Sequence, residues 1–234
     1  MPASSAPGER PVVFILDCDN TLLDNDALKA DLADRLRALL GPQRDAAFWR
    51  AYEAVRDETG TVDYPLTIER FRPILRDDAL LEGVRAVVMD YPFDQRVYPD
   101  ALPALAHLRA IGLPTIVSDG DQVYQPLKIR RSGLAEAVEG RVLVYVHKEA
   151  HLDEIIELWP ADFYVMIDDK ARILSATKAR LPDRFVTMHV RQGHYGLAPV
   201  TATPPPDLTL DHIGDLRGLT PDVLRPHLVV PRTT

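Results

Sequence analysis

Residues 12–21 read VVFILDCDNT, an apolar run that changes abruptly into acidic and amide residues. An unbroken run of β-branched, aromatic and aliphatic residues such as 12–16 is typical of a strand buried on both faces of a parallel sheet. Charged side chains cannot continue such a strand, because burying an unpaired charge is costly. The sequence therefore predicts a central strand that ends directly before Asp17.

The rest of the chain alternates between strand-like and helix-like patterns. Apolar runs of strand length recur at residues 114–117, 141–146, 163–167 and 185–190, with a shorter run at 208–210. Helical periodicity separates them, with Asp100 as the expected cap of the first such helix. Strands that alternate with helices build a parallel sheet covered on both faces. We therefore expect an α/β fold with a Rossmann-like parallel sheet core flanked by helices.

The segment from residue 24 to residue 96 breaks this alternation. Its apolar residues follow helical spacing throughout, which indicates about four helices, with Gly41 and Pro42 ending the first and Pro73 interrupting the third. No strand is expected here. The sequence thus predicts a catalytic core made of residues 1–23 and 97–234 and a small all-helical cap, residues 24–96, inserted after the first strand.

Polar side chains follow four of the predicted strands at the point where each strand ends. They are Asp17, Asp19, Ser118, Lys148, Asp168 and Asp169. The carboxyl ends of parallel strands meet at one edge of a sheet, where ligands bind in such folds. Four converging carboxylates repel one another unless a cation lies between them, and oxygen ligands favour Mg²⁺. A metal ion together with a lysine and a serine suits a phosphate dianion.

These residues resemble the motifs of the haloacid dehalogenase-like superfamily. Asp17 to Thr21 matches its first motif, D-x-D-x-T, while Ser118 and Lys148 resemble the second and third motifs. Asp168 and Asp169 resemble the fourth. The order and spacing agree with the family, the helical insert resembles its small cap, and the resemblance covers roughly residues 11–219. Each motif alone is weak, but four in order are specific.

The resemblance implies a phosphatase that forms an aspartyl-phosphate. Asp17 would be the nucleophile, and Asp19 would protonate the leaving oxygen and then deprotonate water. Ser118 would bind a phosphoryl oxygen and Lys148 would neutralise charge. Asp119 is a further candidate for the phosphate site, although Gly120 after it also suggests a simple turn cap.

The resemblance also implies a Mg²⁺ ion bound by Asp17, Asp19, Asp168 and Asp169. Asp19 would contribute its backbone carbonyl, and Asp169 would bind directly. Asp168 would bind directly or through water, and the sequence leaves open which of Asp168 and Asp169 is the direct ligand. The expected partner is a small phosphorylated metabolite.

Related activities remain as alternatives. A sugar phosphomutase or a phosphonate hydrolase would keep most of these motifs, and the latter uses a cap lysine, of which Lys29 is the only example here. A 2-haloacid dehalogenase is disfavoured because such members lack an acid at the position of Asp19. A non-catalytic aspartyl-phosphate signalling module is disfavoured because Lys148 precedes the acidic pair.

Composition excludes several other classes. The formal net charge is −8 and no long basic run occurs, so we expect no nucleic-acid partner. No apolar stretch approaches the roughly 20 residues that span a bilayer, so we expect no membrane association. Residues 1–11 lack a signal-peptide pattern and the single cysteine, Cys18, excludes an intramolecular disulfide, which favours a cytoplasmic location. Oligomeric state is not encoded in any recognisable pattern.

Two further sets of residues could contact the site or the substrate. The loop at residues 192–195 follows the strand at 185–190 and is expected to lie mainly on the surface. The cap arginines could contact an anionic substrate, although most arginines on protein surfaces are simply solvated. These arginines are Arg50, Arg56, Arg70, Arg72 and Arg76.

Overall fold

The core of the molecule is a six-stranded parallel sheet with the order β3-β2-β1-β4-β5-β6. The computed structural model describes residues 12–227; the expectation for residues 1–11 lies outside this range. The strands are β1 (Val13–Leu16), β2 (Leu113–Asp119), β3 (Val142–Tyr145), β4 (Tyr164–Asp168), β5 (Phe185–Val190) and β6 (Leu208–Leu210). Each one matches a predicted strand and pairs parallel with its neighbours, so the predicted Rossmann-like core is confirmed.

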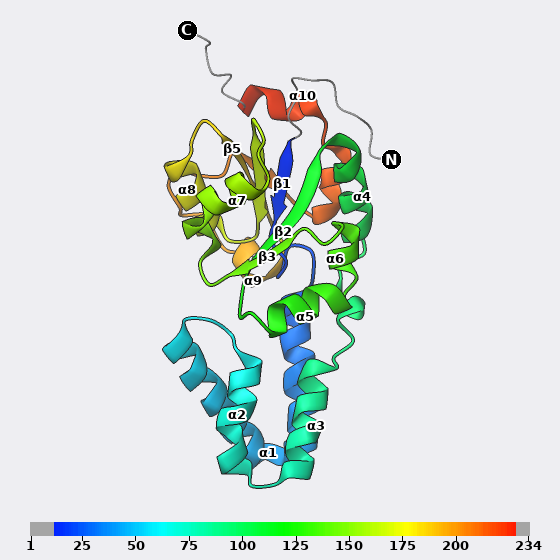
Figure 1. The fold of residues 1–234 in the computed structure, drawn as a ribbon, viewed down its shortest axis with the longest axis vertical. Helices are drawn as coiled ribbons and strands as arrows, with labels where there is room; N and C mark the ends of the chain where they lie inside the picture. The colour runs from blue at the N-terminus through cyan, green and yellow to red at the C-terminus, as the bar shows by residue number, and fades with distance from the viewer. Residues whose placement is uncertain (1–11, 228–234) are drawn as a thin grey trace.

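Helices cover both faces of the sheet (Figure 1). Side chains of β1 alternate between two apolar clusters: Phe14 and Leu16 enter one, Val13 and Ile15 the other. The first cluster includes α4 (Ala101–Ile111), α5 (Tyr124–Arg131), α6 (Leu134–Ala137), η3 (Ile213–Gly218) and α10 (Pro221–Leu224). The second includes α7 (Leu152–Leu158) and α8 (Ala171–Arg180). The period of two in β1 therefore decides which helices each residue contacts.

The inserted segment forms a helical lobe at one end of the sheet (Figure 1). Its helices are α1 (Asn25–Thr59), α2 (Tyr64–Leu75) and α3 (Asp78–Met89), followed by the short η1 (Phe93–Arg96). Within α1, Gly41 has φ 70° and ψ 166°, so two helical segments meet there at a kink, close to the predicted helix end. The predicted interruption at Pro73 is wrong: α2 continues to Leu75, because a proline in the last turn removes only one hydrogen bond.

The two chain segments that join this lobe to the sheet lie side by side. Leu23 and Val97 form an antiparallel bridge. The Asp24 N–H donates to the Arg96 carbonyl at 2.7 Å, and the Tyr98 N–H donates to the Leu22 carbonyl at 3.0 Å. The lobe thus leaves and re-enters the core at one pair of hydrogen-bonded segments, immediately after the acidic end of β1.

Short elements complete the chain, and one predicted cap differs from expectation. The remaining elements are η2 (Lys148–Ala150), α9 (Gly193–Gly196) and η4 (Arg225–His227). Asp100 precedes α4 but its side chain makes no capping hydrogen bond; it accepts one from Arg217 at 2.9 Å instead. Within residues 12–227, no helix combines the length and apolar character needed to cross a lipid bilayer.

Candidate active site

Three carboxylates meet where the strand order reverses. Asp17 follows β1, Asp168 ends β4, and Asp169 comes next in the chain. Because β1 and β4 are hydrogen-bonded neighbours, these side chains share one edge of the sheet. Each of the three is buried, and one oxygen of each lies within 4.8 Å of those of the others. The reversal point of such a sheet is the usual ligand-binding crevice.

A buried lysine connects two of these carboxylates. The Lys148 Nζ lies 2.5 Å from Asp17 Oδ1 and 2.6 Å from Asp168 Oδ2, and it donates to the Val117 carbonyl at 3.1 Å. Burial alone would lower the pKa of Lys148, but the charges of Asp168 and Asp17 outweigh burial and raise it. Lys148 is therefore a fixed positive charge beside Asp17.

Several carboxylate oxygens of the acidic cluster have no hydrogen-bond partner within residues 12–227. Asp17 Oδ2 and both carboxylate oxygens of Asp169 are buried without a hydrogen-bond partner among residues 12–227. Burial, followed by the charges of Asp168 and Asp17, raises the pKa of Asp169 to about 9. Unpartnered carboxylate oxygens around one point are the donor set of a hard divalent cation. These three residues therefore fit a metal ion such as Mg²⁺.

Asp19 lies two residues after Asp17 but has different neighbours. The Lys128 Nζ donates to Asp19 Oδ1 at 2.5 Å and to Asn25 Oδ1 at 3.3 Å. Burial acts to raise the pKa of Asp19, but Lys128 outweighs it, so the pKa is lowered. The Asp19 carboxylate is thus separate from the three-carboxylate cluster. The next residue, Asn20, accepts from the Asn25 N–H at 3.0 Å and so fixes the start of α1 beside this site.

Ser118 and Asp119 stand at the end of β2. The Ser118 Oγ accepts from Gln125 Nε2 at 2.9 Å, which leaves its own proton for another acceptor. Asp119 Oδ1 accepts from the Lys148 N–H at 2.9 Å, so this carboxylate positions the loop that carries Lys148. Burial raises the pKa of Asp119. The roles of both residues in phosphate binding stay predictions.

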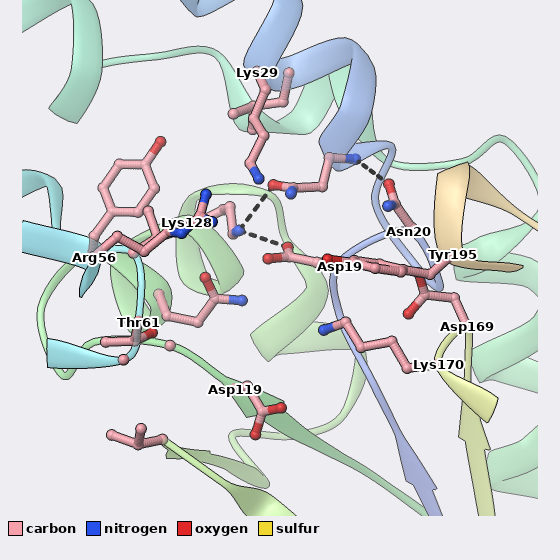
Figure 2. A pocket seen from close by; sticks show the side chains of 18 of the residues that line it. Asp19, Asn20, Lys29, Arg56, Thr61, Asp119, Lys128, Asp169, Lys170 and Tyr195 are labelled. Carbon is pink, nitrogen blue, oxygen red and sulfur yellow. Dashed lines mark hydrogen bonds and ion pairs between the residues drawn. The ribbon is translucent and has the colours of Figure 1, made fainter. Parts of the chain in front are cut away.

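A cavity of about 330 Å³ opens between the sheet edge and the helical lobe. Figure 2 shows Asp119, Asp169 and Lys170 on the sheet side, and Lys29 and Arg56 reaching in from α1. The cavity is also lined by Asp19, Thr61, Tyr64, Gln125, Lys128, His194 and Tyr195. A cavity of this volume lies within the range of small-molecule sites.

Several of these lining residues were not foreseen from the sequence. Lys170 directly follows Asp169, and its position at a strand end was the available signal. Burial would lower the pKa of Lys170, but Asp17 and Asp168 raise it. Lys128 belongs to the most basic stretch of the chain, yet only the fold reveals that α5 points it at Asp19.

The cap arginines and the loop at residues 192–195 differ in whether they line the cavity. Among the five cap arginines, Arg56 alone lines the cavity, whereas Arg70 forms an exposed ion pair with Glu58 at 3.1 Å. The loop at residues 192–195 lies at the surface as expected, since His194 and Tyr195 are exposed, and these two residues also line the cavity. The His194 N–H donates to Asp26 at 2.7 Å. Sequence periodicity cannot show this contact with α1.

The strand order, the carboxylate–lysine cluster at the reversal point and the helical insert after β1 together define a class of Rossmann-like α/β proteins with an aspartate-centred site. A haloacid dehalogenase-like hydrolase from Burkholderia xenovorans LB400 is 47% identical to this chain, covers 90% of it and 99% of its own length, and superposes with a TM-score of 0.83. This chain belongs to the haloacid dehalogenase-like hydrolases.

More distant structures share the fold. The L-2-haloacid dehalogenase of Xanthobacter autotrophicus is 20% identical over 88% of this chain and 97% of its own, with a TM-score of 0.56. The HAD-hydrolase YfnB of Bacillus subtilis, whose structure was bound to magnesium, is 16% identical over 90% and 98%, with a TM-score of 0.59. No protein-family model matches the sequence. No curated protein matches it either.

Proposed function

We propose that this hydrolase is a Mg²⁺-dependent phosphatase that cleaves small phosphomonoesters through an aspartyl-phosphate on Asp17. The observation that carries the proposal is the placement of Asp17, with Lys148 at 2.5 Å and two further carboxylates beside it. An isolated carboxylate is a weak nucleophile toward a phosphate dianion because like charges repel. Adjacent positive charge removes that repulsion and stabilises the transition state.

The proposed reaction has two steps. An Asp17 oxygen attacks phosphorus, the bond from phosphorus to the ester oxygen breaks, and Asp19 gives its proton to the leaving alcohol. Water then attacks the phosphorus of the aspartyl-phosphate, Asp19 takes the proton of that water, and Asp17 is released with inorganic phosphate. Lys128 holds Asp19 ionised, the form that the second step requires. Asp19 must therefore gain a proton when substrate binds.

The metal site is proposed on the same residues. Asp17, Asp168 and Asp169 would hold Mg²⁺, together with the backbone carbonyl of Asp19, and the ion would neutralise phosphoryl charge. The unpartnered oxygens of Asp169 support this assignment. The magnesium bound to the Bacillus subtilis HAD-hydrolase supports it by analogy.

A release assay tests the proposal. The purified protein is incubated with p-nitrophenyl phosphate and a panel of phosphorylated metabolites, with Mg²⁺ or with excess chelator, and inorganic phosphate is measured. We expect turnover with Mg²⁺, loss on chelation and recovery when Mg²⁺ is restored. Undiminished turnover after exhaustive chelation would refute the metal requirement. Halide release from 2-chloropropionate, with no phosphate release from any ester, would identify a dehalogenase instead.

One observation favours a phosphonate hydrolase as the second candidate. Lys29 of α1 reaches the cavity (Figure 2). Burial lowers the pKa of Lys29; the charges of Lys128 and Arg56 act in the same direction, and those of Asp19 and Asp26 act in the opposite one. An amine that loses its proton easily can form an imine with a carbonyl substrate. Borohydride trapping of a phosphonoaldehyde on Lys29 would establish this activity, and its absence would remove the candidate.

A further inference from the structure

The wall of the cavity opposite Asp169 is lined by cations. Lys29 stands on α1 near its start, Arg56 on the same helix near its end, and Lys128 on α5. In Figure 2 the nitrogen atoms of all three turn toward the same space. They come from three separate parts of the chain, so the fold alone brings them together.

The charges on this wall are incompletely balanced. Lys128 is paired with Asp19, but Lys29 makes no hydrogen bond or ion pair anywhere in residues 12–227. Arg56 has an ion pair with Glu53 at 3.2 Å, with both side chains about half exposed, which compensates little. Burial lowers the pKa of Lys29, and the positive charges of Lys128 and Arg56 add to this effect, whereas Asp19 and Asp26 oppose it. An anion bound between Lys29 and Arg56 would remove the repulsion between these cations.

The position of the wall relative to Asp17 indicates which part of a ligand it would meet. The phosphoryl group would lie at Asp17 and Lys148, deep at the sheet edge. Asp19, which would face the ester oxygen, is in contact with Lys128 at 2.5 Å. The alcohol part of the ester would thus extend from Asp19 toward the cation-lined wall. A cavity of about 330 Å³ has room for a small alcohol part that carries a second group.

We propose that Lys29 and Arg56, with Lys128 beside them, form a subsite for a second anionic group on the alcohol part of a small phosphate ester. The second group is a carboxylate or another phosphate, since both accept hydrogen bonds from ammonium and guanidinium groups. This inference rests on the proposed phosphatase activity. It narrows the substrate class from phosphomonoesters in general to phosphomonoesters with a second anionic group on the alcohol part.

Matched substrates test the subsite. 3-Phosphoglycerate and glycerol 3-phosphate differ only in a carboxylate that replaces a hydroxymethyl group, and propane-1,3-diol bisphosphate compared with 3-hydroxypropyl phosphate tests a second phosphate. In at least one pair, we expect kcat/KM to be about tenfold higher for the substrate with two anionic groups, the equivalent of about 1.4 kcal/mol. The pair with the larger ratio identifies the second anion as carboxylate or phosphate.

Variants test whether the cation-lined wall causes the difference in kcat/KM within a substrate pair. Lys29→Met should reduce the preferred ratio about tenfold and Arg56→Met somewhat less, because Arg56 is more exposed. Lys29→Arg should keep the ratio, which separates charge recognition from imine chemistry, since a guanidinium cannot form an imine. Arg50→Met is the matched control: Arg50 is an exposed arginine of α1 that does not line the cavity, and its loss should leave the ratio unchanged.

Failure of the subsite differs from failure of the phosphatase. Phosphate release with equal kcat/KM for both members of each pair in the unaltered protein overturns the subsite and leaves the phosphatase. A ratio that Lys29→Met does not change, in a variant that melts like the unaltered protein, also overturns it. Absence of phosphate release from every ester overturns the phosphatase. In that case, a melting-temperature rise with 3-phosphoglycerate that Lys29→Met abolishes would still support the subsite, and no such rise would overturn it.

Discussion

The two sides of the cavity carry opposite charge and are built differently. On the sheet side Asp169 lines the cavity and belongs to a buried cluster with Asp17 and Asp168, which Lys148 links to each other. The lobe side presents Lys29 and Arg56, which are more accessible and lack comparable partners toward the cavity. The sheet side has buried carboxylate oxygens without a partner, and Lys29 on the lobe side has no ion pair within residues 12–227. If both proposals hold, a metal ion, a phosphate and a second anion complete the site together, with the chemistry on the sheet side.

The largest effect is expected on the sheet side, from Asp17→Asn. An amide is no nucleophile, so phosphate release should fall at least about 10³-fold. The shape of the side chain is kept and Lys148 retains Asp168, so the protein should stay folded. Steady-state kinetics together with thermal melting provide the measurement. A variant with near-normal turnover and normal melting would show that Asp17 is not the nucleophile.

Lys148→Met should affect both stability and turnover. The substitution leaves Asp17 and Asp168 buried beside each other without their shared cation, and breaking a buried pair in this way costs about 3–5 kcal/mol. Denaturant unfolding measures the loss. Lys178→Met is the control: Lys178 pairs with Asp207 at 2.9 Å in a partly exposed position, so its loss should cost about 1 kcal/mol and leave turnover intact. Equal costs for the two variants would contradict the charge assignment.

The sheet side of the comparison could be predicted from sequence because local signals specify it. Buried parallel strands appear as continuous apolar runs, and a polar residue that ends such a run must lie at the sheet edge. All six strands were therefore predictable. So was the meeting of Asp17, Lys148 and Asp168, because strands in one sheet have fixed neighbours. The resemblance to a known family added roles to positions that the strand pattern had already placed.

The lobe side could not be predicted in the same way. Helical periodicity shows which face of α1 is apolar, but not which polar residue of that helix meets the sheet edge. Lys29 and Arg56 lie 27 residues apart, beyond any local pattern, on either side of the kink at Gly41. The same reason explains why the hydrogen bond between His194 and Asp26 was not predicted: it depends on how the lobe sits on the core.

The smallest predicted effect concerns the junction between the two sides. Asp31 of α1 accepts hydrogen bonds from Tyr91 Oη and Arg96 Nη2, both at 2.7 Å, and from Arg35 at 3.1 Å. Arg96 directly precedes Val97, where the chain returns to the core. The network thus ties the start of the lobe to its end. Hydrogen bonds from Arg35, Tyr91 and Arg96 lower the pKa of Asp31 below its ordinary value.

Asp31→Asn should therefore destabilise the protein by about 0.5–1 kcal/mol at neutral pH, a modest amount because water partly reaches the network. The sign of the pH dependence follows from the lowered pKa. The folded protein keeps Asp31 ionised at a pH where the unfolded chain, with a pKa of about 3.9, already binds a proton. The contribution is thus complete above about pH 5 and declines as the pH falls below about 4.

Denaturant unfolding of both proteins at a series of pH values measures this contribution. The difference in unfolding free energy should shrink toward pH 2.5, whereas Asp34→Asn, an exposed substitution one turn along α1, should show little difference at any pH. A difference of the same size at pH 7 and pH 2.5 would mean that Asp31 holds the junction through shape rather than charge.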